Sequence, residues 1–219
     1  MPALKIQPIV ESTHGSELGS AAAGPEFVDE LRRRSKAAHA QLFRRYHGRV
    51  MGIVHRMLGE DTELDDVVQE VFVRAMQAAP KFRGTAESLE PWLVRIAVLT
   101  TRTSIRKKVV RRKFFFIGDP ERETAAPSGN AEAVETIRRL YWVLDQLSTK
   151  TRIPFTLRFV EHMTLPEIAS ACGVSEATAK RRVVEGRARF DRLVQRDPVL
   201  LDLIQRSGSR DSMHNRGAA

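Results

Sequence analysis

Features that would define a secreted, metal-binding or membrane protein are scarce in this chain of 219 residues. It has a single cysteine, Cys172, which excludes an internal disulfide and a cysteine-rich metal site. Its six histidines show no ligand spacing. No stretch approaches the ~20 apolar residues of a membrane span, and residues 1–10 lack the apolar segment of a secretory signal. We therefore expect a cytoplasmic protein without metal or cofactor.

Aromatic residues are also few, and acidic residues are outnumbered by basic ones. Aromatics make up 6% of the chain, so Val, Leu, Ile and Ala supply the core, which suits small helical domains. Lys and Arg number 36 against 27 Asp and Glu, giving a net charge of +9. Such an excess favours a polyanionic partner, most often nucleic acid, with a membrane surface as the competing interpretation.

The apolar residues recur at helical spacing throughout, without strand-like alternation or repeats, and predict an all-α protein. Composition and Gly/Pro breaks divide the chain into two small helical domains joined by a linker, with disordered ends. The expected boundaries are 1–25 for a disordered extension, 26–113 for the first domain, 114–133 for the linker, 134–197 for the second domain and 198–219 for a tail.

Three helices are expected in the first domain. The first has one buried face, made of Leu42, Phe43, Tyr46, Val50, Ile53, Val54 and Met57. After a break at residues 58–61, Asp61 or Thr62 can cap the second helix, which ends before Pro80. Residues 81–91 are expected to form a loop, and the third helix to run from near Trp92 to about Arg112. The Phe114–Phe116 run is expected to pack on a neighbour or a partner.

The second of these helices has one apolar and one acidic face. Its buried stripe is predicted to contain Val67, Val68, Val71, Phe72, Ala75 and Met76. Asp66, Gln69 and Glu70 share a different face, which we expect to be exposed. In so basic a chain, this face indicates a docking site for a basic protein surface. A solvated helix face with no partner explains the same pattern.

The third helix combines an aromatic start with a basic end. Trp92 and Arg95 begin it and lie near Phe82 and Arg83, and Arg102, Arg106 and Lys107 lie towards its end. Aromatic rings beside cations can stack on single-stranded bases, and the basic residues can follow a phosphate backbone. Core packing of Trp92, and the preference of cations for a helix C-terminus, are the structural alternatives.

The second domain carries a helix-turn-helix pattern. Thr164 and Glu167 have capping-box spacing, Gly173 can end the first helix, and Ser175 can cap the second. The second helix begins with cations that could contact the major groove, and its candidate residues are Ser175, Thr178, Lys180, Arg181 and Arg182. Upstream, Ile137, Leu140, Tyr141, Leu144 and Leu147 make one stripe, and Phe155, Leu157 and Phe159 lie on the next helix. Pro154 is expected near the first turn of that helix.

The order of these motifs resembles bacterial RNA polymerase sigma factors of the extracytoplasmic-function (ECF) group. The resemblance rests on Asp65-Asp66-Val67-Val68-Gln69-Glu70-Val71-Phe72, Phe82-Arg83-Gly84, Trp92-Leu93-Val94-Arg95-Ile96-Ala97, Leu165-Pro166-Glu167-Ile168-Ala169 and Gly173-Val174-Ser175. It departs from many members at Leu99 and Thr103, which stand where Asn and Asp are common.

The resemblance implies a role for each motif. Core polymerase would bind the acidic helix at Asp65, Asp66, Gln69, Glu70 and Phe72. The −10 promoter element would contact Phe82, Arg83, Trp92, Arg95, Arg102, Arg106 and Lys107. The helix-turn-helix would recognise the −35 element through the residues given above. An anti-sigma factor is a further partner that the resemblance implies.

Two other functions fit parts of the pattern. A stand-alone helix-turn-helix regulator would use only the second domain and bind duplex DNA without polymerase. A DNA-processing enzyme such as a recombinase would need clustered carboxylates or a nucleophile in a pocket, whereas the acids here lie along one helix face. We therefore predict a non-enzymatic sigma factor.

Overall fold

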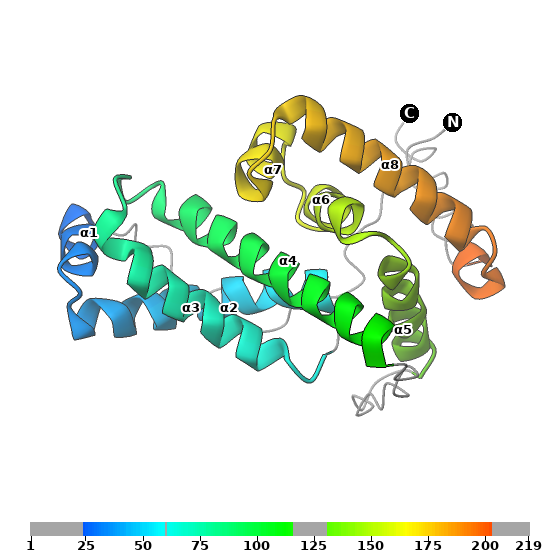
Figure 1. The fold of residues 1–219 in the computed structure, drawn as a ribbon, viewed down its shortest axis with the longest axis horizontal. Helices are drawn as coiled ribbons and strands as arrows, with labels where there is room; N and C mark the ends of the chain where they lie inside the picture. The colour runs from blue at the N-terminus through cyan, green and yellow to red at the C-terminus, as the bar shows by residue number, and fades with distance from the viewer. Residues whose placement is uncertain (1–23, 60, 116–130, 203–219) are drawn as a thin grey trace, which may run out of the picture.

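The computed structural model describes residues 24–59, 61–115 and 131–202, and within these ranges it contains helices and no strand (Figure 1). The all-α prediction is confirmed. The expected N-terminal extension, the middle of the linker and most of the tail lie outside the described residues. The division into two domains stays a prediction.

The N-terminal half packs three long helices against one another. They are α2 (Lys36–Leu58), α3 (Leu64–Ala78) and α4 (Leu89–Phe115), preceded by α1 (Pro25–Arg32) and with the short 3-10 helix η1 (Ala79–Lys81) after α3. Val50, Ile53, Val71 and Leu93 are almost completely buried where the helices meet. Phe43 is an exception to the predicted buried face, because 41% of it is exposed.

The helix boundaries differ from the prediction at two points. Helix α4 begins at Leu89 rather than near Trp92, since Pro91 falls in the first turn, where a missing N–H costs nothing. The residue at the N-cap of α3 is Glu63, not Asp61 or Thr62. Asp61 still assists that helix start, because its carboxylate accepts a hydrogen bond of 2.8 Å from the Glu63 N–H.

The C-terminal half is built from α5 (Ala131–Asp145), α6 (Thr149–Phe159), α7 (Leu165–Cys172) and α8 (Glu176–Val194). Helices α6 and α8 pack tightly at Gly186, where an added Cβ would lie 3.0 Å from the Thr151 carbonyl oxygen. The placement of Pro154 near a first turn was wrong. It lies buried inside α6, so that helix lacks one internal hydrogen bond.

The predicted helix-turn-helix is confirmed in detail. Thr164 and Glu167 form a reciprocal capping box at the start of α7. Gly173 ends α7 in the left-handed conformation, with φ of 65°, and the Ser175 hydroxyl accepts a hydrogen bond from the Thr178 N–H at the start of α8. These local signals set the turn between α7 and α8, and therefore the direction in which α8 leaves it.

The two halves share one apolar core. Helix α4 packs against both α6 and α7, which lie along one side of it in Figure 1. Helix α2 also contacts α6. Ile153, Leu157 and Ile168 from the C-terminal half belong to the same buried cluster as the N-terminal helices. A smaller cluster around Val143, Phe155 and Phe190 holds α5, α6 and α8 together within the C-terminal half. The candidate sites are therefore placed relative to one another by tertiary packing.

Candidate polymerase and nucleic-acid interfaces

Helix α3 presents an acidic face made of Asp65, Asp66, Gln69 and Glu70. The first three side chains are exposed and Glu70 is half-buried. Glu70 pairs with Arg74 one turn later at 2.5 Å. Phe72, which the resemblance also assigns to polymerase binding, is only 2% exposed and packs in the core. Its contribution to docking would come through the shape of α3, not through direct contact.

Two apolar side chains extend this acidic face. Val73 is 40% exposed, and the half-exposed Phe43 of α2 places its ring centroid 4.8 Å from that of Phe72. Sequence reasoning missed both as surface residues. The spacing could have identified Val73, because it lies seven residues after Asp66 and four after Gln69, on the same side of the helix. An acidic rim beside exposed apolar side chains is a usual composition for a protein-binding surface.

Helix α4 gathers its predicted DNA contacts on one side, its basic face, defined by Trp92, Arg95, Arg102 and Arg106. Their spacings of three, seven and four residues bring them onto one side of a helix. The face begins with the Trp92 ring, whose centroid lies 4.9 Å from that of Phe82. Arg83 and Lys107, also predicted, are exposed outside this set.

The loop before α4 is held in place by α1. Arg32 donates hydrogen bonds to the Phe82 carbonyl at 3.0 Å and to the Gly84 carbonyl at 2.7 Å. Gly84 has no room for a side chain, since an added Cβ would lie 2.5 Å from the Phe82 ring. Phe82 itself is buried. The Phe-Arg-Gly motif therefore positions Trp92 and leaves Arg83 as its exposed cation.

The C-terminal end of α7 covers part of the basic face. Arg95 donates a hydrogen bond to the Ser170 carbonyl, and Arg102 donates one to the Cys172 carbonyl at 3.5 Å. The last carbonyls of a helix carry partial negative charge, so two arginines are favourable there. Burial raises the pKa of the Cys172 thiol despite the nearby Arg182, Arg102 and Arg95, so it stays a neutral core residue.

The two positions that depart from the family pattern are joined by a local hydrogen bond. The Thr103 hydroxyl donates to the Leu99 carbonyl at 3.0 Å, one turn earlier on α4, and Leu99 is partly buried. The Asn and Asp common there in the family would offer an amide and a carboxylate. This chain presents a hydroxyl and an apolar side chain instead.

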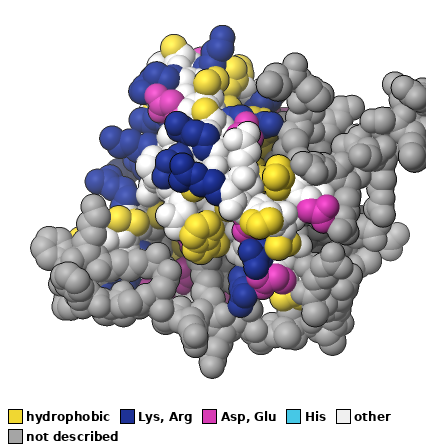
Figure 2. Space-filling model, turned by 90° about the vertical axis from the view of Figure 1, so that its right-hand side faces the viewer, with side chains coloured by type: hydrophobic (Ala, Val, Ile, Leu, Met, Phe, Trp, Pro, Cys, Tyr) yellow, Lys and Arg dark blue, Asp and Glu magenta, His cyan; other side chains and the backbone are white. Residues whose placement is uncertain are grey.

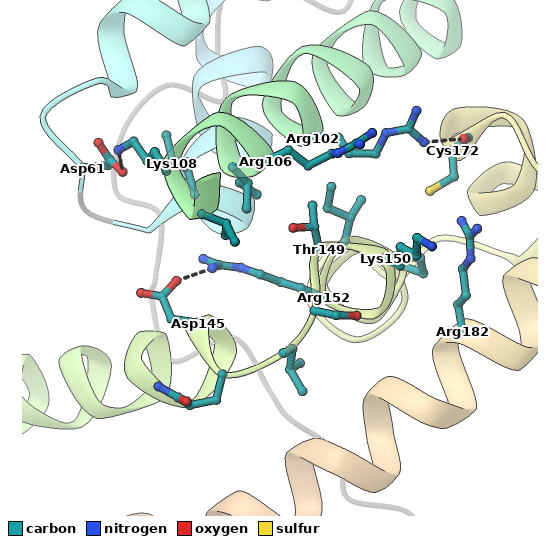
Figure 3. A pocket seen from close by; sticks show the side chains of 18 residues that line it. Asp61, Arg102, Arg106, Lys108, Asp145, Thr149, Lys150, Arg152, Cys172 and Arg182 are labelled. Atoms are coloured by element: carbon teal, nitrogen blue, oxygen red, sulfur yellow. Dashed lines mark hydrogen bonds and ion pairs between the residues drawn. The ribbon is translucent and has the colours of Figure 1, made fainter. Parts of the chain in front are cut away.

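The start of α8 carries the predicted −35 contacts. Lys180 and Arg181 are exposed, and Arg181 pairs with Glu185 at 2.9 Å. The hydroxyl of Ser175 donates to that of Thr178 at 2.9 Å, which holds both at the helix end. Arg182 lies apart from the others, because it lines a cavity against α6 and α7 (Figure 3). The structure thus leaves most of this set available to a ligand.

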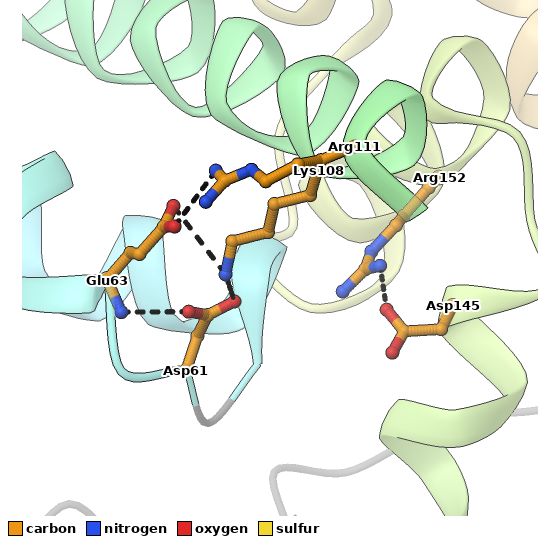
Figure 4. A network of polar contacts seen from close by, with 6 residues as sticks. All are labelled: Asp61, Glu63, Lys108, Arg111, Asp145 and Arg152. Carbon is orange, nitrogen blue, oxygen red and sulfur yellow. Dashed lines mark hydrogen bonds and ion pairs between the residues drawn. The ribbon is translucent and has the colours of Figure 1, made fainter. Parts of the chain in front are cut away.

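That cavity has a volume of about 960 Å³ and lies between α4 of the N-terminal half and the end of α5 and start of α6 in the C-terminal half. Its charged lining residues are mostly cations, namely Arg102, Arg106, Lys108, Lys150, Arg152 and Arg182, with the acids Asp61 and Asp145. The acids are engaged, Asp61 with Lys108 and Asp145 with Arg152 (Figure 4). On the face in Figure 2, Lys and Arg side chains gather on one side, and acidic side chains are fewer and scattered. Three of the predicted DNA contacts, Arg102, Arg106 and Arg182, therefore share this cationic cavity.

The described ranges hold no group of three or more His, Cys, Asp or Glu side chains placed to share a metal ion. None of the helices in those ranges is long and apolar enough to cross a bilayer.

Comparison with known proteins identifies both halves. Residues 42–110 match the family Sigma-70 region 2, and residues 137–190 match Sigma-70, region 4. The RNA polymerase sigma factor NccH of Alcaligenes xylosoxydans xylosoxydans is 30% identical over 183 residues, covering 78% of this chain and 97% of NccH. This chain belongs to the ECF group of RNA polymerase sigma factors. Like other sigma factors, it binds core RNA polymerase and directs initiation at promoters.

Other relatives agree with this assignment. The ECF sigma-E factor of Escherichia coli (strain K12) is 25% identical over 178 residues, 77% of this chain and 92% of that protein. Among solved structures, CnrH in complex with the cytosolic domain of CnrY aligns with a TM-score of 0.55 and 24% identity, over 79% of this chain and 97% of that one. The sigma factor RpoE of Bartonella quintana, solved with the anti-sigma factor NepR, aligns at 0.54 and 19%, over 72% and 97%. These two structures support the fold.

Because the matches span both regions, a stand-alone helix-turn-helix regulator is not favoured for this sigma factor.

Proposed function

We propose that the sigma factor divides its work among three surfaces. The acidic face of α3 docks on core polymerase, the basic face of α4 with the Arg83 loop contacts the −10 element, and the start of α8 contacts the −35 element. The observation that carries this proposal is the exposure of Asp66 and Gln69 beside Val73. In a chain of net charge +9, an exposed acidic and apolar surface suits a basic protein partner, not DNA.

Promoter opening would use binding energy instead of covalent chemistry. Once a base of the −10 strand leaves the stack, Trp92 can stack on it and Arg106 can contact its phosphate. Such contacts exist only with the unpaired strand, so they shift the duplex towards the open state. We therefore propose that the chain has no enzymatic activity of its own and acts in the cytoplasm with polymerase.

We also propose an anti-sigma factor as a partner. The two structural neighbours were solved as complexes, CnrH with the cytosolic domain of CnrY and RpoE with NepR. In this chain, exposed apolar side chains such as Phe43 and Val73 offer a surface for such a partner. An anti-sigma factor that covers them would compete with core polymerase for α3.

Run-off transcription tests the main proposal. Purified chain is added to core polymerase on genomic fragments, and transcript starts are mapped by sequencing. The expected result is initiation that depends on the chain and shares two upstream elements. Failure to confer initiation on any genomic template would contradict the proposal. A gel shift on the mapped promoter, with and without core, separates it from a stand-alone regulator, which would bind tightly without polymerase.

A further inference from the structure

One arginine of α1 holds the loop that precedes the basic face of α4. The Nε–H of Arg32 donates to the Phe82 carbonyl at 3.0 Å, and its Nη2 donates to the Gly84 carbonyl at 2.7 Å. The remaining nitrogen, Nη1, donates to the Asp29 carboxylate at 2.7 Å, three residues earlier on α1. Each nitrogen of the guanidinium is therefore engaged, two by the loop and one by a side chain that orients the group.

The two loop carbonyls lie on either side of Arg83 in the sequence. The Phe82 carbonyl belongs to the peptide group that leads into Arg83, and the Gly84 carbonyl to the second peptide group after it. A planar guanidinium holds its N–H groups in a rigid fork, so it fixes two acceptors relative to each other. The side chain of Arg83 is exposed. Arg32 therefore fixes the backbone from which the exposed cation of the loop projects.

The same arginine is connected to Trp92 through the Phe82 ring. The guanidinium carbon of Arg32 lies 5.9 Å from the centroid of that ring, which lies 4.9 Å from the centroid of Trp92. Phe82 is buried, and a Cβ added to Gly84 would lie 2.5 Å from it. The Trp92 N–H also donates to the Ser88 carbonyl at 3.1 Å, which joins the loop to the first turn of α4. In such close packing, a displacement of the loop is transmitted to the Trp92 ring.

Helix α1 is a firm support for this arginine. Its apolar residues Phe27, Val28 and Leu31 are buried in the core of the N-terminal half. Arg32 is the last residue of the helix, and 32% of its side chain is exposed. The helix lies before the part of the chain that matches region 2, which begins at residue 42. A cation at a helix C-terminus is favourable by itself, but that preference does not account for two bonds to a distant loop.

We propose that Arg32 is a positioning residue for recognition of the −10 element, because it holds the loop so that Arg83 and Trp92 meet the unpaired strand in one geometry. The proposal rests on the proposed −10 roles of those two residues. Arg32 acts through the loop and not by touching DNA. Groups held in their binding geometry bind more tightly and discriminate more sharply than groups that must be ordered during binding. Loss of Arg32 should therefore reduce selectivity among −10 sequences.

The decisive variant is Arg32→Met, which removes every donor but keeps an unbranched apolar stem and good helix propensity. Arg33→Met is its matched control, since it deletes the same charge at the exposed neighbouring position. Arg32→Lys retains the charge without the fork.

Two measurements on the full chain report the position of Trp92 and the selectivity for the −10 element. The chain has two tryptophans, so Trp142→Phe on α5 isolates the emission of Trp92, and acrylamide quenching reports the exposure of its ring. The rate of open-complex formation by the holoenzyme is measured on the mapped promoter and on promoters changed at single −10 positions. Core affinity and thermal melts are recorded for every variant.

We expect Arg32→Met to increase the quenching of Trp92 and to slow open-complex formation about tenfold on the mapped promoter. The loss should be smaller on the altered promoters, so that the ratio of rates falls. Core affinity should be unchanged, and Arg33→Met should match the wild type in all readings. Arg32→Lys should recover only part of the loss, because one ammonium group cannot reproduce the fork.

Several results would overturn the positioning role. They are unchanged quenching, an unchanged ratio of rates, slowing that is equal on all −10 sequences, or wild-type behaviour of Arg32→Lys, which would mean that charge alone suffices. If Arg32→Met melts below the assay temperature, Asp29→Asn takes its place, since that exposed carboxylate only orients the guanidinium. It should shift both readings in the same direction by a smaller amount, and no shift would count against the role.

A further pair of variants separates this inference from the proposed function. If Arg83→Ala and Trp92→Ala keep wild-type selectivity, the −10 role of the loop fails, and the positioning role fails with it. If those two variants lose selectivity while Arg32→Met keeps it, only the positioning role is wrong.

Discussion

Helices α3 and α4 lie side by side in the same half, yet they present their functional faces in opposite ways. The acidic face of α3 is open to solvent, whereas the basic face of α4 is partly covered by α7. If α3 docks on polymerase and α4 contacts promoter DNA, as proposed, the free chain leaves the first surface open and partly covers the second.

The largest expected effect comes from changing the exposed acidic face of α3. Gln69→Ala combined with Glu70→Lys should weaken binding to core polymerase by roughly 2 kcal/mol, about thirtyfold in Kd, because it removes a polar contact and reverses a charge at the docking surface. Surface plasmon resonance against immobilised core measures the change. Glu26→Lys, an exposed charge reversal on α1, serves as the control and should leave affinity unaltered. Equal affinity for the two variants would remove the docking role from α3.

The next prediction concerns an exposed cation outside the covered face. Arg181→Ala on α8 should weaken binding of the holoenzyme to promoter DNA by roughly 1–3 kcal/mol if Arg181 makes a bidentate contact to a base. Arg192→Ala, near the other end of α8, should have little effect. Footprinting titrations on the mapped promoter and on −35 variants provide the test. A loss that is uniform across sequences would reduce Arg181 to a phosphate contact.

A substitution at Arg102 tests the part of the α4 basic face that α7 covers. Arg102→Ala should slow open-complex formation by the holoenzyme about fivefold, or ~1 kcal/mol, through loss of one charged contact. The same change should not weaken strand binding by the free chain, where Arg102 bonds to the Cys172 carbonyl. Arg111→Ala, whose side chain pairs with Glu63 at 3.0 Å, is the control. A parallel loss in free chain and holoenzyme would show that the face is never covered.

The smallest effect concerns α7, the covering helix itself. Hydrogen bonds from the Thr164 hydroxyl and the Thr164 N–H lower the pKa of the Glu167 carboxyl in the folded chain. A lowered pKa stabilises the folded state above the ordinary value of 4.5, and this contribution disappears as pH falls through the folded value. Glu167→Gln should therefore cost ~0.5 kcal/mol at pH 7 and less in acid. Thermal melts across pH, with Glu30→Gln as control, measure it, and a pH-independent difference would contradict the capping role.

Local patterns predicted much of this structure. The capping box at Thr164, the left-handed Gly173 and the Ser175 cap were confirmed because each depends on neighbours within a few residues. The errors arose where contacts between residues distant in sequence decide whether a side chain is buried, or where a helix accepts a residue that local rules disfavour. Phe43 is half-exposed although it shares the period of a buried face, and Pro154 sits inside α6 because surrounding packing tolerates a lost hydrogen bond. Phe72 was predicted both to lie in the buried stripe of α3 and to bind polymerase; its burial is confirmed, and its role in polymerase binding stays a prediction.

By itself, the sequence determined the helices, the acidic and basic faces and the family, since residue type at helical spacing is a local property and motifs survive in any packing. Only the tertiary structure decided which faces are available. The contacts of Arg95 and Arg102 with α7, and of Glu161 with α2, join residues more than 65 positions apart. No periodicity encodes such pairs, because they depend on how whole helices stack around a shared core.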